Sequence, residues 1–309
     1  MNESISQTKS GASRESTHLS SLDHSLRRPR TLFSFCMSAL CAIMSLAAAV
    51  PLFSVLIMLA WRGGARLGLP LFTELPPAAG MDGGGIGNAI VGSLLVVLIA
   101  SVMSVPIGIL SGIFLAEIDP ESRSASVVRF GAKMLTGLPS ILAGVFAYTA
   151  VVLITGRFSS LAGGVALALL MLPIIMLTTE EAIRSVSTEM REGAIAMGTT
   201  KAQLVWHVLF PTALPGILTG VLLALSRGAG ETAPLLFTMT FSDYWLSRNP
   251  MEPTASLAVL IFNFSKSPFE NQQTVAWAAS LVLVLIVLTL TLGGQALSRR
   301  TMAREGALL

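Results

Sequence analysis

Two opposite charges, Arg227 and Glu231, lie inside a long apolar stretch of this 309-residue chain. Residues four apart on a helix are neighbours, so a helix through this stretch would place the guanidinium and the carboxylate on one face. Each charge costs about 2.5–3.5 kcal/mol at the centre of a bilayer, and a chain rarely keeps such charges without a use. An arginine at that depth suits an anion, and the carboxylate can neutralise it while the site is empty.

The neighbours of the two charges favour a transport pathway over a structural ion pair that pins two helices together. Gly228, Gly230 and Pro234 loosen the helix beside the charges, and broken helices beside an ionisable pair are typical of transport pathways. If the spanning helix begins near Pro215, Arg227 lies 12 residues further on. That is about 18 Å along the axis, near the midplane of a ~30 Å hydrocarbon core. We therefore predict that the pair lines a substrate pathway.

The sequence gives no support for an enzymatic function. The chain contains no phosphate-cradling Gly-x-x-x-x-Gly-Lys-[Ser/Thr] loop, no His-Glu-x-x-His, no Cys-x-x-Cys and no Gly-x-Ser-x-Gly. His207 is more typical of a surface or packing residue than of a general base, and Cys36 and Cys41 lie together in an apolar run. We predict that the chain has no catalytic residues, no metal ligands and no cofactor of its own.

The composition places these residues in a membrane. Hydrophobic residues make up 53% of the chain and charged residues only 12%, whereas soluble domains are roughly 25% charged. Six stretches exceed the ~20 residues that cross a bilayer as a helix; they lie within 31–61, 83–116, 134–156, 158–179, 202–241 and 271–298. The predicted fold class is all-α, a polytopic membrane protein with six transmembrane helices. The net charge of +3 then reflects the basic bias of cytoplasmic loops, and no nucleic-acid partner is expected.

The six stretches divide the chain into parts. The Ser- and Arg-rich residues 1–30 are predicted to be a disordered cytoplasmic tail, and 31–61 a retained first transmembrane helix. Residues 83–298 form the core with the other five helices, and 299–309 a second cytoplasmic tail. The N-terminus is placed inside because most of the 20 Lys and Arg residues then fall in cytoplasmic segments. The apolar segment 256–264 is too short to span and is expected to lie on, or dip into, the outer surface.

Prolines and glycines mark the middle helices. Four prolines are expected well inside these spans: Pro106, Pro139, Pro173 and Pro234. Each frees a backbone carbonyl that lipid cannot satisfy, so the helices either pack against neighbours or border a wet cavity. Two glycine pairs fit the small-xxx-small pattern of close helix contact: Gly108/Gly112 and Gly216/Gly220.

The longest cytoplasmic loop, 178–214, is expected to form two short helices. The first stops at Gly198, which can adopt the left-handed conformation found after helices. The second opens at Thr200, where Gln203 completes a capping box, and ends before Pro211. The apolar residues of this helix pair leave three alternatives open: it lies against the inner leaflet, packs under the protein's own helices, or docks a soluble partner.

A spaced pattern in this loop separates the alternatives. Three residues separate Glu192-Gly193-Ala194 from Gly198, and nine more lead to Val208-Leu209-Phe210-Pro211. This pattern resembles the EAA signature of ABC-importer permeases: Glu-Ala-Ala, three residues, Gly, nine residues, Ile, any residue, Leu-Pro. Gly193, Val208 and Phe210 depart from the signature in size only. The resemblance implies an ABC type I importer permease fold in which the loop docks into a cleft on a cytoplasmic ATPase. It assigns this coupling to Glu192, Gly193, Ala194, Gly198 and Pro211.

Two further stretches narrow the resemblance. Residues 223–236 (Leu-Ala-Leu-Ser-Arg-Gly-Ala-Gly-Glu-Thr-Ala-Pro-Leu-Leu) and 135–148 are similar to segments of phosphate-transport permeases of the PstA type. The sister permease of that system usually has Gly-Glu-Thr-Met where this chain has Gly-Glu-Thr-Ala-Pro. The resemblance carries the functional arginine and glutamate of that family onto Arg227 and Glu231.

The resemblance implies a permease subunit of an ATP-driven phosphate importer in the bacterial inner membrane, with both termini cytoplasmic. Its implied partners are a sister permease, cytoplasmic ATPase subunits that bind ATP and Mg, and an extracytoplasmic phosphate-binding protein. A permease for another oxyanion, such as sulfate or molybdate, is the nearest alternative. A proton-coupled secondary transporter would need no partner-docking loop, and a membrane-embedded enzyme would need a nucleophile or a metal site.

Overall fold

The computed structural model describes residues 29–245 and 249–305, and every regular element in these ranges is helical. The chain divides into two units, Met1–Met58 and Leu59–Leu309. The first unit contributes one described helix, α2 (Pro29–Met58), and its large apolar side chains are exposed, among them Phe33, Phe35, Ile43 and Phe53. A helix that is apolar on every side requires a membrane or a protein around it. Apart from its last two residues, the predicted tail 1–30 lies outside the described residues.

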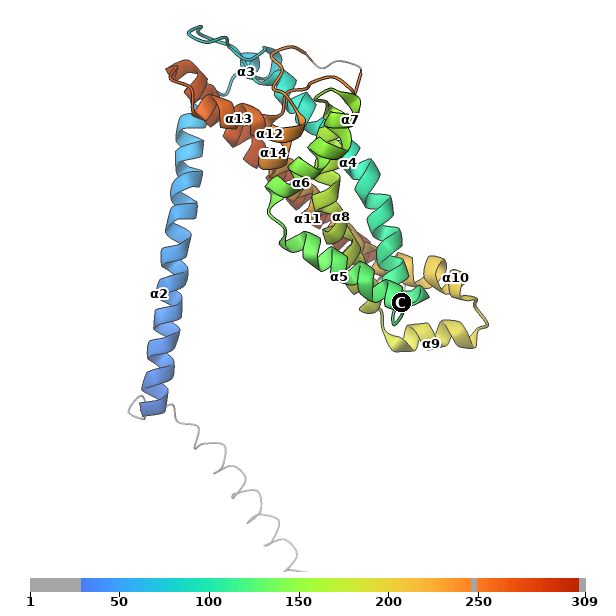
Figure 1. The fold of residues 1–309 in the computed structure, drawn as a ribbon. Helices are drawn as coiled ribbons and strands as arrows, with labels where there is room; N and C mark the ends of the chain where they lie inside the picture. The colour runs from blue at the N-terminus through green and yellow to red at the C-terminus, as the bar shows by residue number, and fades with distance from the viewer. Residues whose placement is uncertain (1–28, 246–248, 306–309) are drawn as a thin grey trace, which may run out of the picture. The chain divides into compact units, whose positions relative to one another are not determined.

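The described part of the second unit contains four long helices: α4 (Gly87–Ile113), α8 (Ser160–Arg184), α11 (Phe210–Gly230) and α14 (Glu270–Glu305). The shorter helices are α3 (Leu69–Thr73), α5 (Arg123–Gly137), α6 (Ser140–Ala147), α7 (Leu153–Thr155), α9 (Thr188–Ala196), α10 (Lys201–Gln203), α12 (Ala233–Thr238) and α13 (Leu257–Ser265). Four π-helical segments prolong their neighbours: η1 (Leu59–Gly63), η2 (Phe114–Ile118), η3 (Tyr148–Val152) and η4 (Leu204–Leu209). Figure 1 shows α9 and α10 at one end of this unit and α3 and α13 at the opposite end.

Five helices of the described residues are long and apolar enough to cross a membrane: Phe33–Gly63, Gly87–Ile118, Ser160–Arg184, Lys201–Gly230 and Glu270–Ala296. A sixth span results if Arg123–Gly137 and Ser140–Thr155, which are bent by 108° at the break between them, count as one. The spans therefore fall where the six apolar stretches of the sequence predict them.

The third predicted span differs from a straight helix, because the 108° bend falls within it. Proline disfavours the helical conformation in the residue before it, and Leu138 is accordingly extended, with ψ of 139°. Pro139 directly precedes the first turn of α6. Pro139 therefore lies at the break of this span and not inside a continuous helix, whereas Pro106 and Pro173 lie within α4 and α8 as predicted.

Helix α8 is the centre of the packing, since α4 and α11 both contact it closely. Both predicted glycine pairs, Gly108/Gly112 on α4 and Gly216/Gly220 on α11, face α8. A Cβ added to Gly112 would lie 2.6 Å from the Cβ of Thr179, which is too short for any larger residue. The pattern thus performs the role predicted for it, because the missing side chains let the backbones approach.

The short apolar segment 256–264 is packed inside the protein. Its residues form α13, and the Ser256 hydroxyl accepts a hydrogen bond from the Val259 N–H at 3.3 Å. Leu257 and Leu260 are fully buried in a cluster with residues of α3, α4 and α14. The segment therefore dips into the helical body, and the alternative that it lies on the surface is wrong.

The second helix of the long loop does not end before Pro211 as predicted. Instead, α10, η4 and α11 continue as one helix, Lys201–Gly230. Pro211 stands in the first turn of α11, directly after the π turn η4. A proline lacks an N–H donor and crowds the carbonyl one turn back, and the wider π turn before it relieves that crowding. Pro215, which was predicted to begin the spanning helix, lies inside α11 and does not interrupt it.

Candidate functional site

The pair of Arg227 and Glu231 lies where α11 ends. Arg227 occupies the last turn of the helix, and Glu231 follows Gly230 with an extended backbone (φ −75°, ψ 128°). The Arg227 Nε lies 3.6 Å from the Glu231 Oε1. The prediction that both residues share one helix face is wrong, because the helix stops between them. Even so, the guanidinium and the carboxylate lie close together.

The helix break has a local cause. Pro234, which was predicted well inside a span, stands in the first turn of the next helix, α12. It has no N–H with which to continue α11. The Glu231 N–H donates to the Gly228 carbonyl at 3.2 Å, and the Leu235 N–H donates to the Thr232 carbonyl at 3.1 Å. The chain therefore leaves one helix and starts another around Glu231.

Two neighbouring helices hold the break in place. A Cβ added to Gly144 of α6 would lie 2.6 Å from the Cα of Pro234. A Cβ added to Gly228 would lie 3.0 Å from the Met171 sulfur of α8. The approach at Gly144 requires glycine and the one at Gly228 leaves little room, so α6 and α8 support the backbone on either side of Glu231.

The exposure of the pair suits ligand binding. The side chain of Arg227 is 45% exposed and that of Glu231 is 17% exposed. A guanidinium has five N–H donors, and a single ion-pair contact of 3.6 Å uses few of them. Charge-assisted, bidentate hydrogen bonds to an oxyanion are the strongest use of the remaining donors. The C-terminal end of a helix favours a positive charge, so it stabilises Arg227, whose donors remain the part of the site suited to an oxyanion.

The α9–α10 pair is held by the features that the sequence predicts. Gly198 adopts φ of 82°, and its N–H donates to the Ile195 carbonyl at 2.9 Å. The Gln203 N–H donates to the Thr200 hydroxyl at 3.3 Å, and the Thr200 N–H donates to the Gln203 Oε1 at 2.9 Å, which completes the capping box. The left-handed glycine and the capping box are thus confirmed.

The residues that the signature assigns to coupling lie mostly on the open side of this pair. The exposed ones are Glu192, Gly193, Gly198 and Pro211. Ala194 is half-buried and packs against a cluster that contains Val186, Leu204 and Leu209. Ile195 and Met197 are large apolar side chains left exposed on the same pair. The pair therefore packs under the protein's own helices on one side and presents an apolar surface with the carboxylate of Glu192 on the other.

A cluster of arginines around η2 escaped the sequence analysis. Arg129 and Arg184 both bind the buried Glu180, at 2.8 Å and 2.9 Å, and both donate to the Leu115 carbonyl at 3.3 Å. In the sequence, these arginines contribute only to the excess of basic residues expected in cytoplasmic segments. The available signal was Glu180 itself, a carboxylate near the end of an apolar span.

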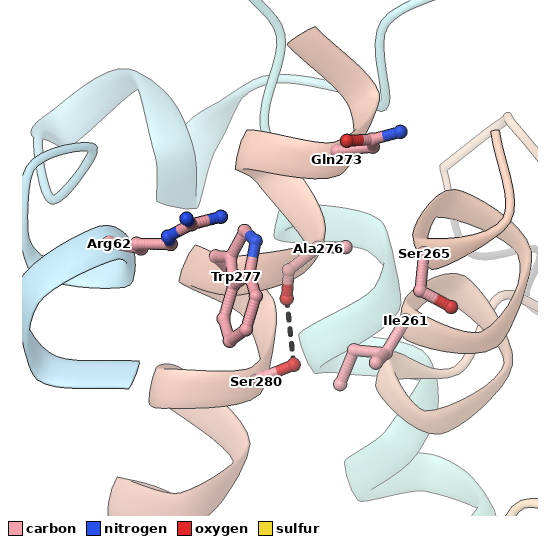
Figure 2. Close-up of a pocket in the computed structure, with 7 residues that line it drawn as sticks. All are labelled: Arg62, Ile261, Ser265, Gln273, Ala276, Trp277 and Ser280. Carbon is pink, nitrogen blue, oxygen red and sulfur yellow. Dashed lines mark hydrogen bonds between the residues drawn. The ribbon is translucent and has the colours of Figure 1, made fainter. Parts of the chain in front are cut away.

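A cavity of about 330 Å³ lies apart from the Arg227–Glu231 pair, between η1, α13 and the start of α14 (Figure 2). The guanidinium carbon of Arg62 lies 5.4 Å from the centre of the Trp277 ring. The Ser280 hydroxyl donates to the Ala276 carbonyl at 2.8 Å, and the Gln273 amide to the Ser267 carbonyl at 2.8 Å. Because these polar groups bond to the backbone, the cavity is more typical of an interfacial Arg–Trp anchor than of a substrate site.

Comparison with known proteins gives consistent results. The chain is 45% identical over 231 residues to the phosphate transport system permease protein PstA of Yersinia pestis, covering 75% of this chain and 78% of the relative. It is 43% identical over 240 residues to the protein of the same name from Xylella fastidiosa (strain Temecula1), covering 77% and 83%. A probable PstA of Methanocaldococcus jannaschii is 36% identical over 262 residues, covering 84% and 90%.

Solved structures share the fold. An inward-facing MetNI methionine ABC transporter matches with a TM-score of 0.56 at 20% identity, over 70% of this chain and 94% of the matched chain. Residues 105–303 match the family model described as "Binding-protein-dependent transport system inner membrane component". This range includes the Arg227–Glu231 pair and the α9–α10 loop. The chain belongs to the family of binding-protein-dependent transport system inner membrane components, with the ABC importer permease fold.

Proposed function

We propose that this chain is the PstA-type permease subunit of an ATP-driven phosphate importer. The observation that carries the proposal is the half-exposed guanidinium of Arg227 beside Glu231 at a helix break. An anion that leaves water requires charge-assisted hydrogen bonds in exchange, and Arg227 can supply them. The identity to proteins named phosphate transport permeases supports phosphate as the anion.

The proposed importer contains further subunits. A sister permease completes the pathway around the exposed side of Arg227, and an extracytoplasmic phosphate-binding protein delivers the anion. Cytoplasmic ATPase subunits bind ATP and Mg and hydrolyse the nucleotide, while this chain binds no cofactor. The complex lies in the bacterial inner membrane, and both termini of this chain face the cytoplasm, as the distribution of basic residues favours.

The α9–α10 loop is proposed to dock onto the ATPase. The exposed Glu192, Ile195 and Met197 offer a carboxylate and apolar groups to such a partner. The buried side of the loop packs against the ends of α4, α8 and α11. A partner that moves the loop therefore also moves those helices.

Labelled-phosphate uptake tests the pathway role. In cells that lack other phosphate importers, Arg227→Gln should abolish uptake, because the charge that replaces water around the anion is gone. Insertion should not suffer, since a charge within a membrane-spanning helix opposes insertion and the change removes it. Arg157→Gln, which removes an equal charge from an exposed loop, is the matched control and should retain uptake.

Two outcomes would contradict the pathway role. Near-normal uptake by the Arg227→Gln protein would reduce the pair to a structural contact, and so would its loss from the membrane. Competition by unlabelled phosphate, sulfate and molybdate in the wild type then identifies the anion. Stronger competition by sulfate or molybdate than by phosphate would reject phosphate as the substrate.

The coupling role has its own test. Gly198→Val should sharply reduce recovery of the ATPase with the membrane subunits, because a β-branched residue resists φ of 82°. Gly293→Val introduces the same side chain on α14, where an added Cβ meets no atom within 4 Å, and should leave recovery unchanged. Glu192→Ala should weaken docking less than Gly198→Val does. Normal ATPase recovery and uptake in the Gly198 variant would exclude the loop as the coupling element.

A further inference from the structure

Arg191 of α9 connects the α9–α10 loop to two spanning helices. Its guanidinium forms an ion pair with the carboxylate of Glu117 in η2, the π turn that prolongs α4. The same guanidinium donates to the Ile183 carbonyl of α8 at 2.6 Å and, through Nε, to the Val186 carbonyl at 3.5 Å. One side chain of the loop thus bridges the ends of α4 and α8.

The contacts of Arg191 differ from those of a surface ion pair. Its side chain and that of Glu117 are both largely buried, and all three guanidinium nitrogens have an acceptor. A planar guanidinium held at several points fixes distance and angle together. The next residue, Glu192, is exposed. Consecutive residues of α9 therefore provide an inner contact with the helices and an outer contact for a partner.

The π turn η2 gathers arginines from three elements. The Leu115 carbonyl accepts hydrogen bonds from Arg129 of α5 and Arg184 of α8. Glu117, two residues further, accepts from Arg191 of α9. π-helical turns are frequent at functional sites, and this one is the point at which the loop, α4, α5 and α8 meet.

We infer that Arg191 is a positioning residue that transmits displacement of the α9–α10 loop to α4 and α8 through Glu117. The inference rests on the proposed function, in which the loop docks onto the ATPase. Apolar contacts of the loop allow sliding, because they have no preferred direction. The ion pair and carbonyl bonds of Arg191 resist sliding, so a partner that moves α9 draws both helices with it.

The test uses the complete importer in liposomes: this chain, its sister permease, the ATPase and the phosphate-binding protein. The readout is phosphate transported per ATP hydrolysed. Arg191→Gln and Glu117→Gln should each lower this ratio by about fivefold, which is the low end of typical coupling between sites, with normal recovery of the ATPase. Arg123→Gln removes an exposed arginine at the start of α5 and should leave the ratio unchanged. The exchanged pair, Arg191→Glu with Glu117→Arg, should regain part of the ratio.

Each outcome decides the matter. An unchanged ratio in both single variants overturns the inference. Loss of the ATPase from assembled Arg191→Gln complexes also overturns it, because Arg191 would then be a docking residue. If Arg191→Gln fails to assemble, the Glu117→Gln complex and the exchanged pair decide: a low ratio that the exchange raises supports transmission, and any other result rejects it. Failure of the proposed function looks different, since the wild-type complex would then import no phosphate.

Discussion

Two of the arginine–glutamate sites in the described residues, at the end of α11 and around Glu180, use the same chemical groups in different ways. At the end of α11, Arg227 meets Glu231 at 3.6 Å, and nearly half of the arginine side chain is exposed. Beside η2, Glu180 is 8% exposed and binds Arg129 at 2.8 Å and Arg184 at 2.9 Å. Arg129 and Arg184 also donate to backbone carbonyls. The Arg227–Glu231 contact instead lies where α11 ends.

This difference separates a structural site from one that can bind a ligand. A guanidinium whose donors are occupied by a carboxylate and carbonyls has little capacity for an incoming anion, and removing a partner leaves a buried charge uncompensated. A guanidinium with one long contact retains its donors and loses little when that contact opens. The same substitution should therefore have opposite consequences at the two sites.

Neutralising the glutamate should give the largest contrast. Glu180→Gln leaves the largely buried Arg129 without its counter-charge, and should destabilise the protein by about 3 kcal/mol, the lower end for a broken buried pair, because Arg129 keeps the Leu115 carbonyl. Glu231→Gln should leave stability almost unchanged, since Arg227 is already half exposed. Thermal unfolding of the purified variants in detergent measures both. Equal melting temperatures for the two variants would remove the distinction between the sites.

Replacing arginine by lysine should give an intermediate contrast. Arg227→Lys should lower phosphate uptake by roughly tenfold with normal protein levels, because an ammonium lacks the planar fork and one charge-assisted hydrogen bond contributes about 1.5–3 kcal/mol. Arg129→Lys should instead lower the melting temperature by about 2–4 °C, which corresponds to ~1 kcal/mol, with uptake reduced only in proportion to protein level. Uptake assays and melting curves of both variants test whether Arg227→Lys affects mainly transport and Arg129→Lys mainly stability. A lower melting temperature of the Arg227→Lys protein would show that Arg227 makes a stabilising contact and does not keep its donors available for a ligand.

Removal of Arg184 should have the smallest effect. Its side chain is 49% exposed, and an exposed ion pair contributes only about 0–1 kcal/mol. Arg184→Gln should therefore shift the melting temperature far less than Glu180→Gln does. A shift as large as that of the glutamate variant would show that the cluster acts as one unit, and that exposure is a poor guide to its energetics.

The sequence predicts those features that depend on neighbouring residues. The apolar stretches, the capping box of Thr200 and Gln203, and the left-handed Gly198 follow from local patterns, and the structure has all of them. The end of α11 at Gly230 and the 108° bend before Pro139 were missed. An uncharged window shows where a helix can lie, but not where a proline divides it.

Long-range contacts were not accessible from the sequence. Arg191 and Glu117 are 74 residues apart, and Arg129 and Glu180 are 51 apart. No short-range pattern pairs them, and a basic residue in a cytoplasmic loop has the same local signature whether it is buried or solvated. The burial of α13 is another such case, because its short apolar run is compatible with a surface position or an interior one.

The glycine faces around α8 restrict where the molecule can bend. Since the glycines of α4 and α11 leave no spare room against side chains of α8 such as Ile175 and Thr178, we expect these three helices to move as a rigid body. Flexing is then easier at interruptions of helical hydrogen bonding, such as those before Pro139 and at Glu231. The segments beyond them, α6 and α12, touch each other through Gly144 and Pro234. A displacement of either segment would therefore displace the other.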